Sequence, residues 1–184
     1  MKIRKATKED RRVLVGLFNF LESLELDIFE ECGTVKTFEI VRECFLSEED
    51  RFSYNNCFVF EHEEEILGFR FEYHFDDVEK MRDFWFKKIV PSFNLTNKTI
   101  LFDYDEALAG EYYLDTIYVF DHARSLGVGT ELLADFCYKD YPVKSLNVAK
   151  DNDNARRLYA RFGFYKTCEI KIAGEDYDHL ILKN

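Results

Sequence analysis

The strongest constraint on the fold is a turn with two glycines that joins an extended run to a helical one. Residues 111–119 (Glu-Tyr-Tyr-Leu-Asp-Thr-Ile-Tyr-Val) are rich in aromatic and β-branched residues, so they predict a strand. The turn ends in Gly127 and Gly129, and apolar residues at helical spacing follow it. These residues are Leu132, Leu133, Phe136 and Cys137. Because glycine has no Cβ, the backbone of this turn can approach a ligand closely.

The same turn has the chemistry of an anion site. The first amides of a helix have no partner within the helix, and the helix dipole places positive charge at that end. Arg124, just before the glycines, adds a fixed positive charge. We therefore expect a phosphate-type anion to bind here. The alternative is a glycine turn that holds no ligand.

Two other phosphate-binding motifs compete for this turn. A dinucleotide-binding fold uses G-x-G-x-x-G, but the third position is Leu132, and too little chain follows for a doubly wound sheet. Asp151 does lie at a suitable distance for binding a ribose. A nucleotide P-loop needs a G-K-[S/T] ending, which the turn lacks.

A second block follows the turn, and the two together resemble a known family. The block is Leu146-Asn-Val148, then Asn152-x-x-Ala155-x-x-Leu158-Tyr159-x-x-x-Gly163-Phe164. With Arg124-x-x-Gly127-x-Gly129 before it, it resembles the GCN5-related N-acetyltransferases. The two motifs cover roughly a third of the chain, in the order and at the spacing of that family.

The resemblance implies an α/β (α+β) fold, with a mixed, mostly antiparallel sheet that is flanked by helices and splayed at the strand that binds acetyl-CoA. The strand before the turn would pair with the pantetheine arm through Ile117, Tyr118 and Val119. The turn would hold the diphosphate of coenzyme A, chiefly through backbone amides from Leu126 to Thr130. The residues of this turn are Arg124, Ser125, Leu126, Gly127, Val128, Gly129 and Thr130.

The helix of the second block provides a candidate acid. Asn152, Ala155 and Tyr159 lie on one helical face, and Asn152 is suited to cap that helix. The resemblance implies that all three contact the cofactor and that Tyr159 lies near the thioester sulfur as general acid. A phenol, with a reference pKa of about 10, is protonated at neutral pH and can donate. The alternative is a core tyrosine. Gly163 is expected to end the helix in the left-handed conformation.

The general base is predicted to lie in the strand before the turn. Residues 113–119 resemble the corresponding strand of polyamine acetyltransferases, where an acidic residue stands at the place of Asp115. Alternation puts Glu111, Tyr113, Asp115 and Ile117 on one face of the strand. Asp115 is the first candidate for the base and Glu111 the second. The alternative is that Asp115 has a structural role.

Charge and cysteine content narrow the class of protein. The net charge of −11 argues against nucleic-acid binding and suits a cationic substrate such as an amine, or it keeps the protein soluble. The five cysteines are scattered and form no C-x-x-C pair, which favours reduced thiols in the cytoplasm. The histidines form no H-E-x-x-H, so no metal site is expected. No stretch is long enough to span a membrane.

The remaining chain predicts elements of a single domain over residues 1–184, with an insertion at about 76–110. A short strand at 3–6 precedes a helix whose apolar stripe runs from Val13 to Leu24. Gly33 would separate that region from a second helix, with Val35, Phe38, Val41 and Phe45 buried. Hairpins are expected at 57–75 and 164–182. The insertion carries a helix around Trp85, which either roofs an acceptor pocket, makes a subunit contact or packs internally, and an extra strand at 100–104.

The resemblance implies an acyltransferase, and the acidic charge suits an amine substrate. The enzyme would transfer an acetyl group from acetyl-CoA to a primary amine of a small cationic molecule, by direct attack in a ternary complex. The alternative is a non-catalytic sensor or interaction subunit that binds acyl-CoA with the same fold. The resemblance also allows a homodimer.

Overall fold

The computed structural model describes residues 1–102, 105–172 and 174–183. Within them, seven strands form one open sheet in the order β1-β2-β3-β4-β5-β7-β6. The strands are β1 (Lys2–Lys5), β2 (Cys57–His62), β3 (Glu65–His74), β4 (Tyr112–Val119), β5 (Val143–Ala149), β6 (Tyr165–Ile172) and β7 (Glu175–Lys183). Only β4 and β5 pair in parallel; the other neighbours are antiparallel. The predicted mixed, mostly antiparallel sheet is confirmed.

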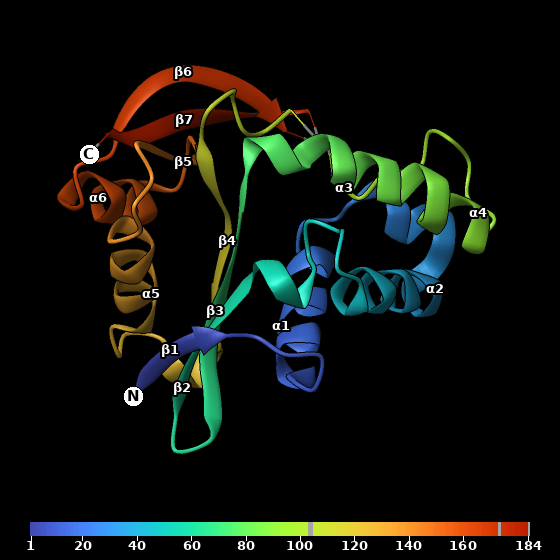
Figure 1. Ribbon diagram of the computed structural model, residues 1–184, viewed down its shortest axis with the longest axis horizontal. Helices are drawn as coiled ribbons and strands as arrows, with labels where there is room; N and C mark the ends of the chain where they lie inside the picture. Colours follow the sequence, from blue (N-terminus) through green and yellow to red (C-terminus); the bar gives the residue numbers. More distant parts are fainter. Residues whose placement is uncertain (103–104, 173, 184) are drawn as a thin grey trace.

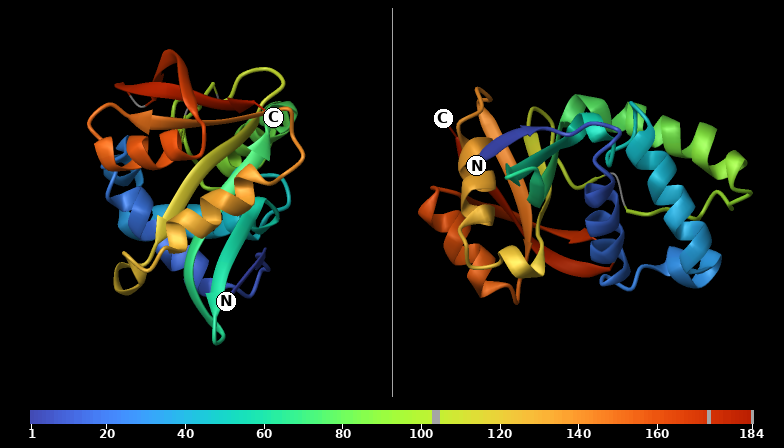
Figure 2. Two further views of the ribbon diagram at one scale, coloured as in Figure 1. Left: turned by 90° about the vertical axis from the view of Figure 1, so that its left-hand side faces the viewer. Right: turned by 90° about the horizontal axis from the view of Figure 1, so that it is seen from below.

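Helices flank the sheet on both faces (Figures 1 and 2). α5 and α6 lie on one side, while α1 and α2 lie on the other together with the segment from α3 to α4. The helices are α1 (Arg11–Glu22), α2 (Asp27–Leu46), α3 (Val78–Phe84), α4 (Val90–Ser92), α5 (Val128–Cys137) and α6 (Asp153–Arg161). A π-helical turn, Trp85–Ile89, joins α3 to α4.

The larger core lies between the sheet and α1 and α2. The apolar stripe predicted for α1 is buried at Val13, Leu14, Leu17, Phe18 and Leu21. Gly16 allows the helix to approach the sheet closely, since a Cβ at this position would lie 2.7 Å from the ring of Phe69. Phe69 also stacks on Tyr118 of β4, with ring centroids 5.1 Å apart. Helix α1 and strands β3 and β4 therefore pack closely through these aromatic rings.

Gly33 breaks α2 into two helical segments, as its sequence predicts. Its φ of 74° is in the left-handed region, where glycine is least strained. After the break the buried positions are Thr37, Ile40, Val41, Cys44 and Phe45. The expectation that Val35 is buried is wrong: it is 77% exposed, because it lies off this stripe of 3.6-residue period.

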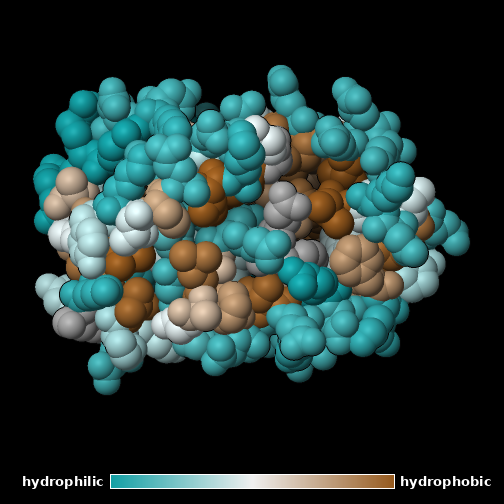
Figure 3. Space-filling model, turned by 90° about the horizontal axis from the view of Figure 1, so that it is seen from above, coloured by the Kyte–Doolittle hydropathy of each residue, from teal (hydrophilic) through white to brown (hydrophobic). Residues whose placement is uncertain are grey.

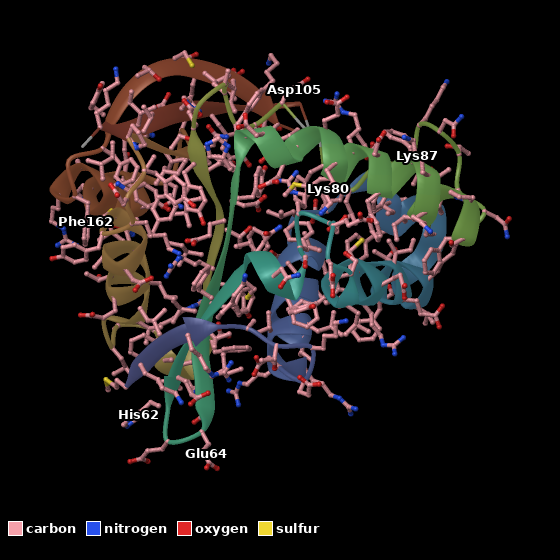
Figure 4. All side chains as sticks on the ribbon, in the orientation of Figure 1. His62, Glu64, Lys80, Lys87, Asp105 and Phe162 are labelled. Atoms are coloured by element: carbon pink, nitrogen blue, oxygen red, sulfur yellow. The ribbon has the colours of Figure 1, made fainter. Side chains whose placement is uncertain are left out.

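The two predicted hairpins form. β2 and β3 pair from end to end, and the acidic turn between them lies at the edge of the molecule, where Figure 4 labels His62 and Glu64. β6 and β7 pair as the closing hairpin; Ala173, in its predicted turn, lies outside the described residues.

The segment at 76–110 contributes the predicted helix. Trp85 does not roof a pocket: it is 1% exposed, packs in the larger core and donates a hydrogen bond from Nε1 to the Thr99 carbonyl over 2.9 Å. The extra strand expected at 100–104 does not form at 100–102, and residues 103 and 104 lie outside the described part. The end of this segment instead brings Phe102 and Glu106 to the centre of the sheet.

β4 carries an irregularity that matters for the site. In its ladder with β3, Phe71 pairs with Thr116 and Glu72 pairs with Leu114, so Asp115 is the extra residue of a β-bulge. The bulge breaks the alternation predicted for this strand. Asp115 faces the side of α1 and α2, whereas Ile117 packs with the clusters under α5. The expectation that both lie on one face is therefore wrong.

β4 and β5 part after a short contact. They pair only from Tyr112 with Lys144 to Leu114 with Leu146, while β5 continues alongside β7 to Ala149. The part of β4 from Asp115 to Val119 is thus left without a neighbour on this side among the described residues. This parting is the predicted splay, and it opens the sheet at its middle.

Candidate active site

A cavity of about 270 Å³ lies where β4 and β5 part. It is lined by the end of α1, the loop after α2, the segment before β4, both parting strands, α6 and the β6–β7 hairpin. The lining residues are Phe20, Leu24, Arg51, Phe102, Glu106, Tyr113, Asp115, Thr116, Ile117, Asn147, Val148, Ala149, Asn152, Ala155, Tyr159, Ile172 and Tyr177. The wall is therefore part aromatic and part charged.

Five residues predicted for the site meet in this cavity: Asp115, Ile117, Asn152, Ala155 and Tyr159. Two other residues predicted for the site, Tyr118 and Val119 of β4, are not among the residues that line the cavity. Tyr118 stacks on Phe69 in the larger core, and Val119 packs in the smaller cluster beneath α5. Their side chains thus pack into the protein, so a ligand that lies along β4 could meet only the backbone groups that β4 does not share with β3.

The glycine turn lies at the N-terminus of α5. Gly127 has a φ of 84° and directly precedes the helix, which begins at Val128. Within the described chain, no backbone oxygen accepts from the amides of Ser125, Gly127, Val128, Gly129 or Thr130. The amide of Leu126 is different, since it donates to the Ala123 carbonyl over 3.4 Å. Among the described residues, the amides predicted to bind an anion therefore have no backbone partner, apart from that of Leu126.

Arg124 is on the surface beside the turn. Its guanidinium lies 2.8 Å from a carboxylate oxygen of Asp121, and both side chains are exposed. A surface pair of this kind contributes about 0–1 kcal/mol to stability. Arg124 can therefore exchange this partner for another anion at little cost.

Tyr159 extends from α6, whose two ends are formed by predicted residues. The side chain of Asn152 caps the helix by accepting from the Ala155 amide over 3.1 Å, and Gly163 ends it with a φ of 89°. The Tyr159 ring packs edge-on against Phe164. Burial raises the pKa of Tyr159 to about 12, and its hydroxyl forms no hydrogen bond with any described residue. It is a protonated phenol at the wall of a cavity.

Asp115 is not a free carboxylate. Arg51 lies against it, with Nε 2.9 Å from Oδ2, and the Thr116 hydroxyl donates to Oδ1 over 2.8 Å. Nη1 of the same arginine lies 3.0 Å from Oε1 of Glu106. The three charged side chains are each at most 6% exposed, so they form a buried cluster at the cavity wall.

Glu111, the second candidate base, lies outside the cavity lining. It accepts from the Leu108 amide over 2.8 Å and lies 3.1 Å from Nε2 of His179. Burial by itself would raise the pKa of Glu111, but these hydrogen bonds outweigh it and lower the pKa. The other ring nitrogen of His179 lies 2.7 Å from Oδ1 of Asn147.

The sequence does not point to Arg51, Glu106 or Asn147. Arg51 and Glu106 lie in loops with no periodic pattern, and their partners are 64 and 55 residues away along the chain. A buried ion pair between loops has no local signature. The only sequence signal is that Glu106 belongs to an insertion of the kind that often carries function.

The described residues include no group of three or more His, Cys, Asp or Glu side chains placed to hold a metal ion. None of the helices in the described chain is long and apolar enough to cross a membrane.

Comparisons with known proteins extend these observations. The sequence model of the acetyltransferase (GNAT) family matches residues 18–164, which include the whole run from β4 to the end of α6. No curated protein matches the chain.

Three solved structures similar to this chain are acetyltransferases by description. One acetyltransferase is 30% identical, with 100% of this chain and 99% of that chain covered and a TM-score of 0.84. An N-acetyltransferase from Staphylococcus aureus Mu50 is 23% identical, with 99% and 100% covered and a TM-score of 0.84. A protein described as histone acetyltransferase HPA2 and related acetyltransferase, from Corynebacterium glutamicum ATCC 13032, is 21% identical, with 98% and 94% covered and a TM-score of 0.66. The last two likenesses show a shared fold.

Proposed function

Because this chain belongs to the acetyltransferase (GNAT) family and is thus an acyltransferase, we propose that it transfers an acetyl group from acetyl-CoA to a primary amine of a small cationic molecule. The observation that carries this proposal is the cavity where β4 and β5 part. It brings Tyr159 of α6 together with the carboxylates of Asp115 and Glu106. Acyl transfer to an ammonium requires an acid and a base, and this cavity holds candidates for both.

Acetyl-CoA, as the co-substrate, would bind across α5, β4 and α6. The unpaired amides at the N-terminus of α5 suit its diphosphate, and the free side of β4 suits the amide groups of its pantetheine arm. The proposed contacts are Ile117, Tyr118, Val119, Arg124, Ser125, Leu126, Gly127, Val128, Gly129, Thr130, Asn152, Ala155 and Tyr159. For Leu126 the contact would be through the exposed side chain, because its amide is already bonded.

The proposed reaction is a direct attack of the amine on the thioester carbonyl. Tyr159 would give its proton to the departing thiolate sulfur, and a cavity carboxylate would first remove a proton from the acceptor ammonium. A covalent acetyl-enzyme has little support, since no cysteine or serine is among the described residues that line the cavity.

The acceptor is proposed to be cationic. Two carboxylates and one guanidinium line the cavity among the described residues, so negative groups outnumber positive ones. The aromatic walls include Phe20, Phe102 and Tyr177, whose ring faces attract cations. The face in Figure 3 is hydrophilic around its rim, and apolar side chains show in its middle.

A cytoplasmic location is proposed from the thiols. All five cysteines are unpaired. Burial raises the pKa of Cys44 and Cys57, and it raises that of Cys137 to about 11, so these three are poor nucleophiles. Unpaired, unreactive cysteines are typical of proteins in reducing compartments.

The test is a thiol-release assay with acetyl-CoA and a panel of amines. The panel would include polyamines, aminoglycosides, amino acids and a peptide with a free N-terminus. We expect release of coenzyme A with at least one small polycationic amine, and mass spectrometry should find the product heavier by one acetyl group.

Two other outcomes distinguish the alternatives. If coenzyme A raises the melting temperature but no amine releases thiol, the chain is a non-catalytic sensor of acyl-CoA. If only the peptide is acetylated, the reaction class stands and the proposed small-molecule acceptor is wrong.

A further inference from the structure

The cavity contains two carboxylates, and their surroundings differ. Asp115 comes from the bulge of β4, and Glu106 comes from the segment before that strand. We propose that Glu106, rather than Asp115, is the catalytic base that removes the proton from the acceptor ammonium. This inference rests on the proposed acetyl transfer and names the group that carries out one of its steps.

Both carboxylate oxygens of Asp115 accept hydrogen bonds, and Arg51 donates two of them. Its Oδ2 accepts from Nε of Arg51 at 2.9 Å and from Nη2 at 2.5 Å, and its Oδ1 accepts from the Thr116 hydroxyl at 2.8 Å. A guanidinium that donates twice to a carboxylate stabilises its ionised form. Asp115 is therefore occupied in holding Arg51 in place.

Glu106 accepts fewer hydrogen bonds from Arg51 than Asp115 does. Its Oε1 lies 3.0 Å from Nη1 of Arg51, and its Oε2 accepts from the Tyr113 hydroxyl at 3.0 Å. It thus has one charged donor and one neutral donor, and each oxygen keeps a lone pair for a further partner. With 6% of its side chain exposed, it can meet an ammonium that enters the cavity away from bulk water.

The position of Glu106 is fixed from β5 as well. Nδ2 of Asn147 donates to the main-chain oxygen of Glu106 at 3.0 Å and to the Tyr113 hydroxyl at 2.9 Å. Because a main-chain oxygen can only accept, this contact sets which way the Asn147 amide points. Its Oδ1 then faces Nδ1 of His179, and Glu111 lies beyond that ring. A buried chain of hydrogen bonds therefore holds both the backbone and the carboxylate of Glu106.

The electrostatics of the cluster agree with this role. Burial raises the pKa of Glu106, and the neighbouring Asp115 adds to this, while Arg51 opposes it. A carboxyl group with a raised pKa is closer in proton affinity to an amine and is a better base. Among the described residues, the titratable groups that interact with Glu106 are Arg51 from the loop after α2, Asp115 and Tyr113 from β4, and Tyr177 from β7. Burial raises the pKa of both tyrosines, so they stay neutral near neutral pH.

The proton balance of the step is simple. Glu106 takes one proton from the ammonium, and the free amine forms a bond to the thioester carbonyl carbon. When the C–S bond breaks, the thiolate sulfur takes a proton from Tyr159, and the second proton of the attacking nitrogen restores the phenol. Glu106 releases its proton to solvent, so each turnover yields the amide, free coenzyme A thiol and one proton.

The test is the pH dependence of kcat/KM for the acceptor, measured in variants of matched shape. Glu106→Gln keeps the shape of the side chain and, through its remaining oxygen, an acceptor for Arg51, but it cannot take a proton. We expect it to lower kcat by ~10²–10⁴-fold. It should also abolish the acidic limb of the profile, which is the fall in kcat/KM at low pH as the base becomes protonated. Glu106→Asp should recover part of the activity together with the limb. Asp115→Asn should lower activity while the limb remains.

Two further variants sharpen the assignment. Tyr113→Phe removes the donor to Oε2, so the ionised carboxylate loses stabilisation and the acidic limb should move to higher pH by about one unit. Asp105→Asn is the control: its side chain is 94% exposed and lies at the outer edge of the molecule (Figure 4), so its profile should match the wild type.

The outcomes are separable. If the wild type is active and Glu106→Gln keeps the acidic limb, or if Asp115→Asn abolishes it, the inference is overturned while acetyl transfer stands. If the wild type releases no thiol with any amine, the proposed function is wrong and this inference falls with it. Should Glu106→Gln fail to fold, the position of the limb in Tyr113→Phe decides: an unmoved limb overturns the inference.

Discussion

At the scale of single residues, Tyr159 offers the most direct test of the chemistry. Tyr159→Phe removes the hydroxyl and keeps the ring that packs on Phe164. If the phenol protonates the leaving thiolate, kcat should fall by ~10²-fold or more, since general acid catalysis contributes on this scale. The affinity for acetyl-CoA, measured by calorimetry, should change little. Unchanged turnover would remove Tyr159 from the acid role.

The burial of Asp50 leads to a separate prediction about how stability depends on pH. It is 2% exposed, and burial raises its pKa to about 6, although its Oδ1 accepts from the Phe52 amide. The folded pKa is above the unfolded value, so the folded state binds more protons between pH 4 and 6. Stability from this group is therefore lost as pH rises through that window, by about 3 kcal/mol in total.

Asp50→Asn should remove this pH dependence. The amide oxygen can still accept from the Phe52 amide, and no charge has to be buried. Relative to the wild type, the variant should gain unfolding free energy as pH rises from about 4 to 7, measured by urea denaturation. Glu49→Gln, at the exposed neighbouring position, should show no such gain. A constant difference between Asp50→Asn and the wild type across this range would contradict the pKa direction.

At the scale of elements, the turn before α5 can be tested through its two glycines. Gly127 has a φ of 84°, so Gly127→Ala should cost about 1–2 kcal/mol of unfolding free energy through backbone strain alone, since nothing lies within 4 Å of the added Cβ. Gly129→Ala is the matched control. Its Cβ would lie 3.5 Å from Val119, an ordinary contact, within a helix that favours alanine. Thermal unfolding without ligand should separate the two variants; equal losses would contradict the role given to the left-handed turn.

The sequence predicts these elements to different degrees, for physical reasons. α1, the β2–β3 hairpin and the capped helix α6 follow from local periodicity and capping, which neighbouring residues determine. The bulge at Asp115 cannot be predicted in this way, because it depends on how β4 registers with β3.

The same limit applies within the site. Tyr159 and the glycine turn belong to contiguous motifs, so the sequence places them. The pairing of Arg51 with Asp115 and Glu106 joins three separate loops and strands, and it exists only after the chain has folded. This is why Asp115 could be predicted in the site while its engagement by a guanidinium could not.

At the scale of the whole molecule, the net charge of −11 should affect binding of the acceptor. An acidic protein attracts a polycationic amine, and salt screens this attraction. The KM for such an amine should therefore rise several-fold between about 0.02 and 0.3 M salt, while the KM for acetyl-CoA should not rise. A neutral amine of similar size is the control. A salt-independent KM for the polycation would indicate that recognition is confined to the cavity.

The narrow junction between β4 and β5 has a consequence for dynamics. In the described chain three residue pairs join β4 to β5, fewer than any other two neighbouring strands share, and the proposed substrate site lies at this junction. Coenzyme A bound between β4 and β5 would add contacts that connect the two halves of the sheet. Hydrogen exchange should then slow on both sides at once when coenzyme A is added, even in strands that never touch it.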